Sequence, residues 1–352
     1  MAAEEAEGAA DIFTLMAAQQ AEILRHEPPQ RDSELLFLGS TQSGKSTLVN
    51  SFLKVEENPP KPTTALEYRF ARPADATGAA SVCNVWELAG GTQLSELLKV
   101  VLLPEKLEAC VVAITLDLSA PGDALETMLF WFEQIRKHVG LSLQQVAASG
   151  PGGAEKAMAL RERANEAWSD HPDRDDLRPL GIPVMVFAHK WDVFEEEYGE
   201  AEYRKVLTRA LRYFAHTNGA SLMCTHHKDK SMLSIARKLI NHHVFDMPAL
   251  KSVQLEHNKP LVVPVTADSF AGIGPPPQVE GVISDDKGDK WKAAFEAFFP
   301  AKREKKDAQD QAVMVDAEQF AEETVDDLRR AKQEELFKLR AQMHGEASAI
   351  PS

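Results

Sequence analysis

The stretch Gly39-Ser-Thr-Gln-Ser-Gly-Lys45-Ser46 decides the fold of this chain. It follows the apolar run Leu35-Leu-Phe-Leu38 and precedes Thr47-Leu-Val-Asn-Ser-Phe-Leu53, which indicates a strand, a glycine-rich loop and a helix. In the pattern G-x-x-x-x-G-K-[ST], the backbone N–H groups surround phosphates, the lysine reaches the β- and γ-phosphates, and the hydroxyl ligates Mg²⁺. The predicted nucleotide-binding residues of this P-loop are Gly39, Ser40, Thr41, Gln42, Ser43, Gly44, Lys45, Ser46 and Thr47.

The composition narrows the class of protein. The chain has 352 residues, 44% of them hydrophobic, and a formal net charge of -15, which suits one large domain or two. Because an acidic chain repels phosphate backbones, we expect no nucleic-acid binding. No apolar run reaches roughly 18 residues and no secretory signal pattern opens the chain, so we expect a cytosolic protein without membrane insertion. Reduced, buried thiols are expected for Cys83, Cys110 and Cys224, which lie in strand-like runs.

Apolar runs alternate with helical patterns along most of the chain. The run Ala109-Cys-Val-Val-Ala-Ile-Thr-Leu-Asp-Leu118 is nearly continuous, which is typical of a central parallel strand covered on both faces, and we expect it to be the deepest strand. The order β-α-β-β-α-β-α-β-α-β-α predicts an α/β fold with a mostly parallel, doubly wound sheet. One antiparallel edge pairing is predicted near residues 67–88.

The segments after the P-loop helix carry the candidates for magnesium binding and hydrolysis. In a GTP-binding switch protein a threonine here ligates Mg²⁺ and senses the γ-phosphate. The two alternatives for this chain are that Thr63 or Thr64 has that role, or that both threonines cap the next strand. A small GTPase then has Asp-x-x-Gly-Gln, in which the glutamine orients the attacking water. This chain has Glu87-Leu-Ala-Gly-Gly91, so we predict that it does not hydrolyse GTP by that route. The candidate magnesium ligands are Ser46, Thr63, Thr64 and Glu87.

The turn His189-Lys-Trp-Asp192 occupies the place of the Asn-Lys-x-Asp motif of guanine-selective pockets. Lys190 and Asp192 match that motif and are predicted nucleotide contacts. A histidine cannot reproduce both hydrogen-bonding roles of the asparagine amide, so the guanine preference is weakened rather than excluded. The histidine pairs at 226–227 and 242–243 lack acidic or cysteine partners at a metal-site spacing, and we predict no metal there.

The chain divides into three predicted regions. These are an N-terminal helical extension (1–30), a P-loop domain (31–245) with a partly helical surface insertion at about 146–180, and a C-terminal extension of extended segments and helices (246–352). The apolar stripe within 9–26 indicates a helix that packs on its own domain or on a partner. The charged helix predicted for 318–343 is either a solvated tail or a segment that docks on a larger partner.

Six features carry a family resemblance: the P-loop, Pro62-Thr-Thr-Ala-Leu-Glu-Tyr68, Trp86-Glu-Leu-Ala-Gly-Gly91, His189-Lys-Trp-Asp-Val-Phe194, Asp268-Ser-Phe-Ala-Gly-Ile-Gly-Pro-Pro276 and the charged C-terminal helix. Together they resemble the light intermediate chains of cytoplasmic dynein 2, the motor of retrograde intraflagellar transport. The resemblance runs from about residue 9 to the C-terminus and is weakest over 146–180.

The resemblance implies a Ras-like P-loop domain in a non-catalytic motor subunit. Such a subunit binds and stabilises the dynein 2 heavy-chain tail, alongside other dynein 2 subunits and intraflagellar-transport trains. Its expected location is the cytoplasm and the cytoskeleton of the cilium or flagellum, including the axoneme and basal body. The P-loop then either holds GDP or GTP with Mg²⁺ as a static brace or is empty. The alternatives are an active GTP-hydrolysing switch, based on the intact Lys45 and Ser46, and an ATP-using kinase-like enzyme, which the lack of an arginine-rich lid segment disfavours.

Overall fold

The computed structural model describes residues 32–55, 60–73, 81–279 and 284–301, together with Asp327, Arg330, Ala331, Lys332 and Glu335. The chain separates into two units, residues 1–301 and 302–352, and each is treated by itself. The helix expected within 9–26 lies outside the described residues. The five described residues of the second unit are all helical and exposed, in agreement with the helix expected over 318–343, most of which lies outside the described residues.

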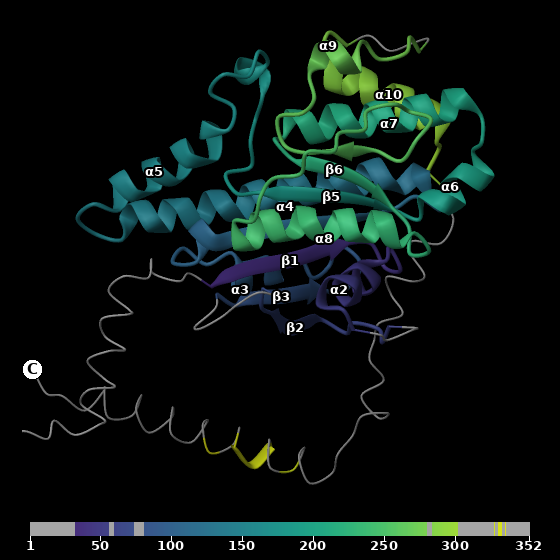
Figure 1. Cartoon of the computed structure of the whole chain (residues 1–352). Helices are drawn as coiled ribbons and strands as arrows, with labels where there is room; N and C mark the ends of the chain where they lie inside the picture. Colours follow the sequence, from purple (N-terminus) through teal and green to yellow (C-terminus); the bar gives the residue numbers. More distant parts are fainter. Residues whose placement is uncertain are drawn as a thin grey trace, which may run out of the picture. The chain divides into compact units, whose positions relative to one another are not determined.

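Within the described residues, the first unit is built on a seven-stranded sheet in the order β2-β3-β1-β4-β5-β6-β7 (Figure 1). The strands are β1 (Ser33–Gly39), β2 (Leu66–Ala71), β3 (Cys83–Leu88), β4 (Cys110–Asp117), β5 (Val184–His189), β6 (Ser221–Thr225) and β7 (Val262–Val263). The four central strand pairs, β3–β1, β1–β4, β4–β5 and β5–β6, are parallel, as predicted. Strand β2 pairs antiparallel with β3, also as predicted. The other edge is also antiparallel, because β7 runs against β6. Of these two antiparallel edge pairings, only the one between β2 and β3 was predicted from the sequence.

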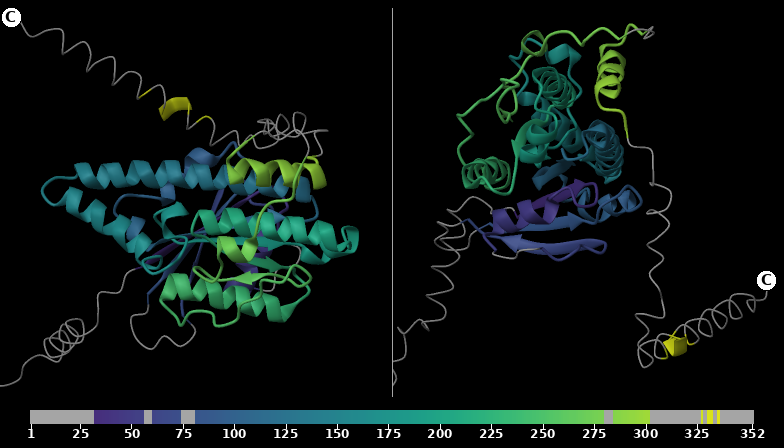
Figure 2. Two further views of the ribbon diagram at one scale, coloured as in Figure 1. Left: turned by 90° about the horizontal axis from the view of Figure 1, so that it is seen from above. Right: turned by 90° about the vertical axis from the view of Figure 1, so that its right-hand side faces the viewer.

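Helices cover both faces of the sheet (Figures 1 and 2). They are α2 (Lys45–Leu53), α3 (Leu98–Val101), α4 (Pro121–Ala148), α5 (Gly153–Glu166), α6 (Trp191–Glu197), α7 (Ala201–Thr217), α8 (Lys230–Phe245), α9 (Phe270–Ile273) and α10 (Lys287–Phe298). On one face α2 packs against α8, and on the other α4 packs against α3, α7 and α10. None of the described helices is long and apolar enough to cross a membrane.

The core lies on both sides of β1 and β4. Every residue of β1 is buried, and in β4 only Asp117 at the carboxyl end is partly exposed, which confirms the central strand predicted from its apolar run. The three cysteines are free and buried, as expected. Burial raises the pKa of each thiol to about 12, so these cysteines are unreactive components of the core.

The predicted surface insertion at about 146–180 is partly wrong. It does contain a helix, α5, but α4 continues to Ala148, and the segment after α5 returns to the core. Trp168, Leu177 and Leu180 are each less than a tenth exposed. The charged and small residues around these apolar anchors hid them in the sequence, because isolated anchors leave no periodic pattern.

The described residues of 246–279 and 284–301 pack on the same core as the P-loop region. Three aromatic side chains are buried against α7 and neighbouring rings: Trp291 and Phe295 of α10, and Phe299 just after it. The stretch 268–277 contains the short helix α9. It is anchored by Asp268, which accepts two hydrogen bonds from Arg212 at 2.7 and 2.6 Å.

Candidate functional site

The P-loop joins the end of β1 to the start of α2 and requires glycine at two positions. Gly39 has a φ of 145°, and a Cβ there would lie 2.2 Å from the carbonyl oxygen of Thr115. Gly44 has a φ of 92°, and a Cβ there would lie 2.2 Å from Cδ2 of His189. A larger residue would therefore clash with the β4 backbone at Gly39 or with the His189 ring at Gly44, and both positions have the positive φ that glycine tolerates best.

Lys45 is the buried cation of this loop. Its ammonium group donates hydrogen bonds to the carbonyl oxygens of Ser40 at 2.8 Å and Gly39 at 3.3 Å. Burial lowers the pKa of Lys45 to about 8, and the nearby negative charge of Glu87 opposes that shift. A buried ammonium group with one acidic neighbour favours an additional anion, which is the electrostatic role of a nucleotide phosphate.

Ser46 and Glu87 meet directly beside Lys45. The Ser46 hydroxyl donates to Oε1 of Glu87 at 2.5 Å. Oε2 of Glu87 and the Ser43 hydroxyl are buried and have no hydrogen-bond partner among the described residues. A hydroxyl and a carboxylate are the oxygen ligands that Mg²⁺ prefers, so these residues fit a magnesium ion bound with a phosphate. The structure brings these two candidate magnesium ligands together, and their binding of a metal stays a prediction.

The loop after β3 packs on the P-loop. A Cβ on Gly90 would lie 2.3 Å from the Cα atom of Thr41, so the two backbones are in contact. In a small switch GTPase the glycine at this place contacts the γ-phosphate. In this conformation Thr41 lies directly beside Gly90. Gly91 has a φ of 97° with open space around it, and it offers no side chain to a water molecule.

The two candidate threonines lie apart from this cluster. The Thr63 hydroxyl contacts Oε2 of Glu67 on β2 at 3.4 Å, and Thr64 is exposed. In the described part of the chain, neither threonine makes a hydrogen bond with Ser46 or Glu87. Thr63 therefore contacts the next strand, and magnesium binding by either threonine stays a prediction.

His189 connects three elements at the carboxyl edge of the sheet. Its Nδ1 atom lies 2.9 Å from the Thr225 hydroxyl at the end of β6, and its ring packs against Gly44. The side chain is 2% exposed, and burial lowers its pKa to about 4, so the ring is neutral at physiological pH. His189 therefore acts as a clamp between the P-loop and β6.

Lys190 and Asp192 flank the start of α6. The ammonium group of Lys190 lies 2.5 Å from Oδ2 of Asp117, at the end of β4. Oδ2 of Asp192 pairs with Lys228 at 3.2 Å, whereas its Oδ1 is buried without a partner among the residues described. The predicted contact of Asp192 with a nucleotide base stays a prediction.

A cluster of possible metal ligands lies outside this site. The ligand atoms of His171, Asp173 and His216 lie within 4.8 Å of one another. They are already joined by hydrogen bonds: His216 Nε2 donates to Oδ2 of Asp173 at 2.8 Å, and the Phe270 N–H donates to the same oxygen at 2.8 Å. His171 Nε2 donates to the Asp268 carbonyl at 2.9 Å. The cluster fastens the segment after α5 to the loop before α9.

Comparisons with known proteins fit this geometry. The model of the family described as dynein light intermediate chain (DLIC) matches residues 25–173 and 155–274. The chain belongs to this family. Cytoplasmic dynein 2 light intermediate chain 1 of Bos taurus is 34% identical over 316 residues, which cover 87% of this chain and 86% of that protein. The Homo sapiens protein of that name is 34% identical over 313 residues, with 86% of each chain covered.

Two further dynein light intermediate chains are more distant. Cytoplasmic dynein 1 light intermediate chain 1 of Homo sapiens is 26% identical over 269 residues, covering 68% of this chain and 51% of that protein. The crystal structure of the dynein light intermediate chain's conserved domain is 19% identical and superposes with a TM-score of 0.53, covering 76% of this chain and 98% of that one. This structural match supports the α/β fold with its mostly parallel sheet.

Sequence reasoning missed several members of the site of this light intermediate chain. Asp117 and Thr225 end β4 and β6, and Lys228 precedes α8. Their signal was positional: in open α/β sheets, ligands bind outside the carboxyl ends of the strands, where Asp117 and Thr225 lie.

Proposed function

We propose that this chain is a non-catalytic light intermediate chain of the cytoplasmic dynein 2 motor. It binds and stabilises the heavy-chain tail for retrograde intraflagellar transport and cilium assembly, together with other dynein 2 subunits and intraflagellar-transport trains. It acts in the cytoplasm and in the cilium or flagellum, at the axoneme and basal body.

The observation that carries this proposal is the contrast between two groups of relatives. The dynein 2 light intermediate chains match at 32–34% identity over most of both chains. The human dynein 1 chain matches at 26% over about half of its length. The longer and stronger match favours dynein 2 as the motor.

The non-catalytic role is supported by the contacts of the P-loop. Ser46 already bonds to Glu87, Gly90 packs on Thr41, and Gly91 cannot orient a water molecule. In the proposed subunit the pocket holds GDP or GTP with Mg²⁺ as a static brace, or is empty, and the outer surfaces bind the partners.

Co-expression with heavy-chain tails tests the proposal. The full chain is expressed with a dynein 2 tail or, as the matched control, a dynein 1 tail, and co-purification is measured by size-exclusion chromatography. We expect a stable complex with the dynein 2 tail and at least a tenfold lower yield with the dynein 1 tail. Equal recovery with both tails would contradict the assignment to dynein 2, and recovery with neither would contradict the subunit role.

An active GTP-hydrolysing switch is the second candidate. The buried ammonium of Lys45 and the free Oδ1 of Asp192 are the observations that favour it. Nucleotide extraction from the purified complex, followed by single-turnover assays with radiolabelled GTP, separates the two. GTP turnover that disappears in Lys45→Ala would establish the switch and exclude the static brace.

A further inference from the structure

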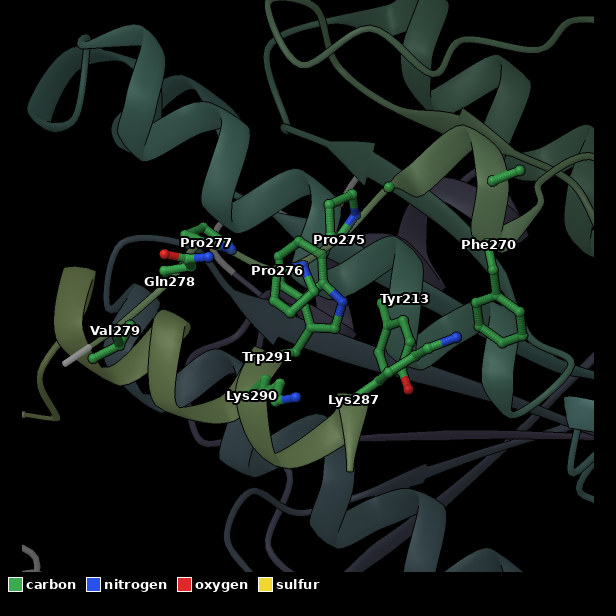
Figure 3. Close-up of a pocket in the computed structure, with 12 residues that line it drawn as sticks. Tyr213, Phe270, Pro275, Pro276, Pro277, Gln278, Val279, Lys287, Lys290 and Trp291 are labelled. Carbon is green, nitrogen blue, oxygen red and sulfur yellow. The ribbon is translucent and has the colours of Figure 1, made fainter. Parts of the chain in front are cut away.

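A cavity of about 760 Å³ opens among α7, α9 and α10, within the first unit (Figure 3). Its volume falls in the range of ligand pockets, and its lining is mainly aromatic and apolar. The proposed function gives it no role, and it shares no lining residue with the P-loop site.

The floor of this cavity is a row of three packed rings. Tyr213 lies between Trp291 and Phe270, with ring centroids 6.0 and 5.5 Å away (Figure 3). Trp291 is 1% exposed, and the guanidinium carbon of Arg209 lies 5.7 Å from its ring centroid. Rings held in this way lose little conformational entropy on binding, which is how aromatic residues contribute to interface hot spots.

One wall is the proline segment Pro275–Pro277. The side chain of Arg209 donates to the carbonyl of Ile273 and fixes the end of α9 just before this segment. Prolines have no N–H group, and in the described part of the chain none of these three carbonyls accepts a hydrogen bond. The wall therefore presents ring faces and free acceptors, which suit the N–H groups of an extended peptide.

The charges at the rim indicate the chemistry of the occupant. Lys287 and Lys290 are the lysines of the lining, and no described carboxylate pairs with either of them. On the same helix Lys292 does have a partner, Asp289, at 3.8 Å. Two unpaired cations beside an apolar floor favour a ligand with carboxylates next to an apolar side chain. A phosphate would lack N–H donors here, because the wall is made of prolines.

We infer that this cavity is a docking site for an extended acidic segment of a partner protein. An apolar side chain of that segment packs on the partly exposed rings of Tyr213 and Phe270. Its flanking carboxylates pair with Lys287 and Lys290, and its N–H groups donate to the proline carbonyls. The inference does not depend on heavy-chain binding, which can succeed or fail separately.

A peptide array tests this with the full chain. Each fluorescent peptide carries a central Leu, Phe or Trp flanked on both sides by glutamates; a matched set has lysines instead. We expect the acidic set to bind, by fluorescence anisotropy, at least tenfold more tightly than the basic set, and more weakly at high salt. Equal binding of both sets, or no binding of any acidic peptide, would overturn the inference. A second copy of the chain as the occupant, seen as a dimer by light scattering, would overturn it as well.

Two variants place the binding in this cavity. The double change Lys287→Glu and Lys290→Glu is expected to weaken acidic-peptide binding about tenfold, and Ala271→Trp, at an exposed lining position, is expected to block it. Lys292→Glu, on the same helix, is the matched control and should leave binding unchanged. All variants should keep the native thermal midpoint. Retained affinity in both test variants would refute the site.

Discussion

The P-loop edge and the aromatic cavity of this light intermediate chain differ in whether their polar side chains already have partners within the chain. At the P-loop edge, the side chains that belong to sequence motifs bond within the site: Ser46 to Glu87, and Lys190 to Asp117. In addition, Gly90 packs against Thr41. At the cavity the lining is mainly aromatic and apolar, and no carboxylate among the described residues pairs with Lys287 or Lys290.

This difference shows that the backbone shape that a motif specifies and the chemistry that the motif suggests are separate properties. A P-loop specifies a backbone shape, because its glycines and lysine are needed to form the turn itself. Whether the shape serves chemistry depends on groups elsewhere in the chain, such as Gly91. We expect the surfaces of α7, α9 and α10 to serve binding, and the P-loop to serve mainly the fold.

The largest expected effect comes from the anchor of the cavity. Arg212 and Asp268 are 6% and 3% exposed and form a doubly hydrogen-bonded pair. Asp268→Asn leaves the guanidinium charge buried without a counter-charge, so we expect a loss of about 3–5 kcal/mol in unfolding free energy by urea denaturation.

The matched control for Asp268→Asn is Glu256→Gln. Glu256 pairs with Lys259, and both side chains are more than half exposed. Breaking that pair should cost less than about 1 kcal/mol. Equal losses in both variants would show that the Arg212–Asp268 pair does not anchor the segment before α9.

The next largest effect concerns the clamp at the P-loop edge. His189 has a folded-state pKa of about 4 against an ordinary value of 6.5, so between these values the unfolded chain binds more protons. Its contribution to stability is therefore complete above about pH 6.5 and is lost as the pH falls toward 4, by about 3 kcal/mol in total. We expect His189→Asn to remove that part of the acid-induced loss, measured by urea denaturation at several pH values.

His243→Asn serves as the comparison for the clamp. His243 also has a pKa lowered to about 4, by burial and then by the charge of His242, but it lies near the end of α8 rather than against Gly44. Both variants should flatten the pH profile, and only His189→Asn should alter nucleotide binding. If the unfolding free energy of His189→Asn fell with decreasing pH as much as that of the native chain, the buried neutral ring of His189 would not contribute to stability as proposed.

Much of this fold followed from periodicity. The β1–loop–α2 unit and the central strand β4 have patterns long enough to identify, and the structure places them as predicted. The strand β7 has two residues, too few to show a period. Helix α4 continues to Ala148, into the predicted insertion, and polar residues interrupt its apolar stripe. Ser142, for example, is buried and donates to the carbonyl of Leu102.

The candidate site was predictable in its residue types but not in its pairings. Lys45, Ser46 and Glu87 follow from local motifs. The His189 clamp depends on strand register, because β5 places His189 opposite both Asp117 of β4 and Thr225 of β6. No local pattern encodes that register, so the roles of Asp117 and Thr225 became visible only in the folded chain.

A smaller effect tests whether the P-loop still holds a nucleotide. Lys45→Met removes the ammonium group that faces the loop, so we expect it to reduce the stabilisation of the full chain by saturating GDP and Mg²⁺ by about 2 kcal/mol. Differential scanning fluorimetry with and without GDP measures this, with the exposed Lys156→Met as control. No GDP-dependent shift in the native chain would show that the pocket is empty.

The smallest expected effect concerns Gly91. Gly91→Gln restores the side chain of the water-orienting position, and a Cβ there meets no atom within 4 Å, but the φ of 97° should cost about 1 kcal/mol. The matched control is Gly140→Gln in α4, where a Cβ is also unobstructed and the helical backbone should make the change neutral or stabilising. We expect no GTP turnover in either variant, because Gly90 still packs on Thr41 and Glu87 still engages Ser46. Turnover in Gly91→Gln would mean that one missing side chain, rather than the closed contacts around it, separates this P-loop from an active one, and the contrast with the open cavity would then fail.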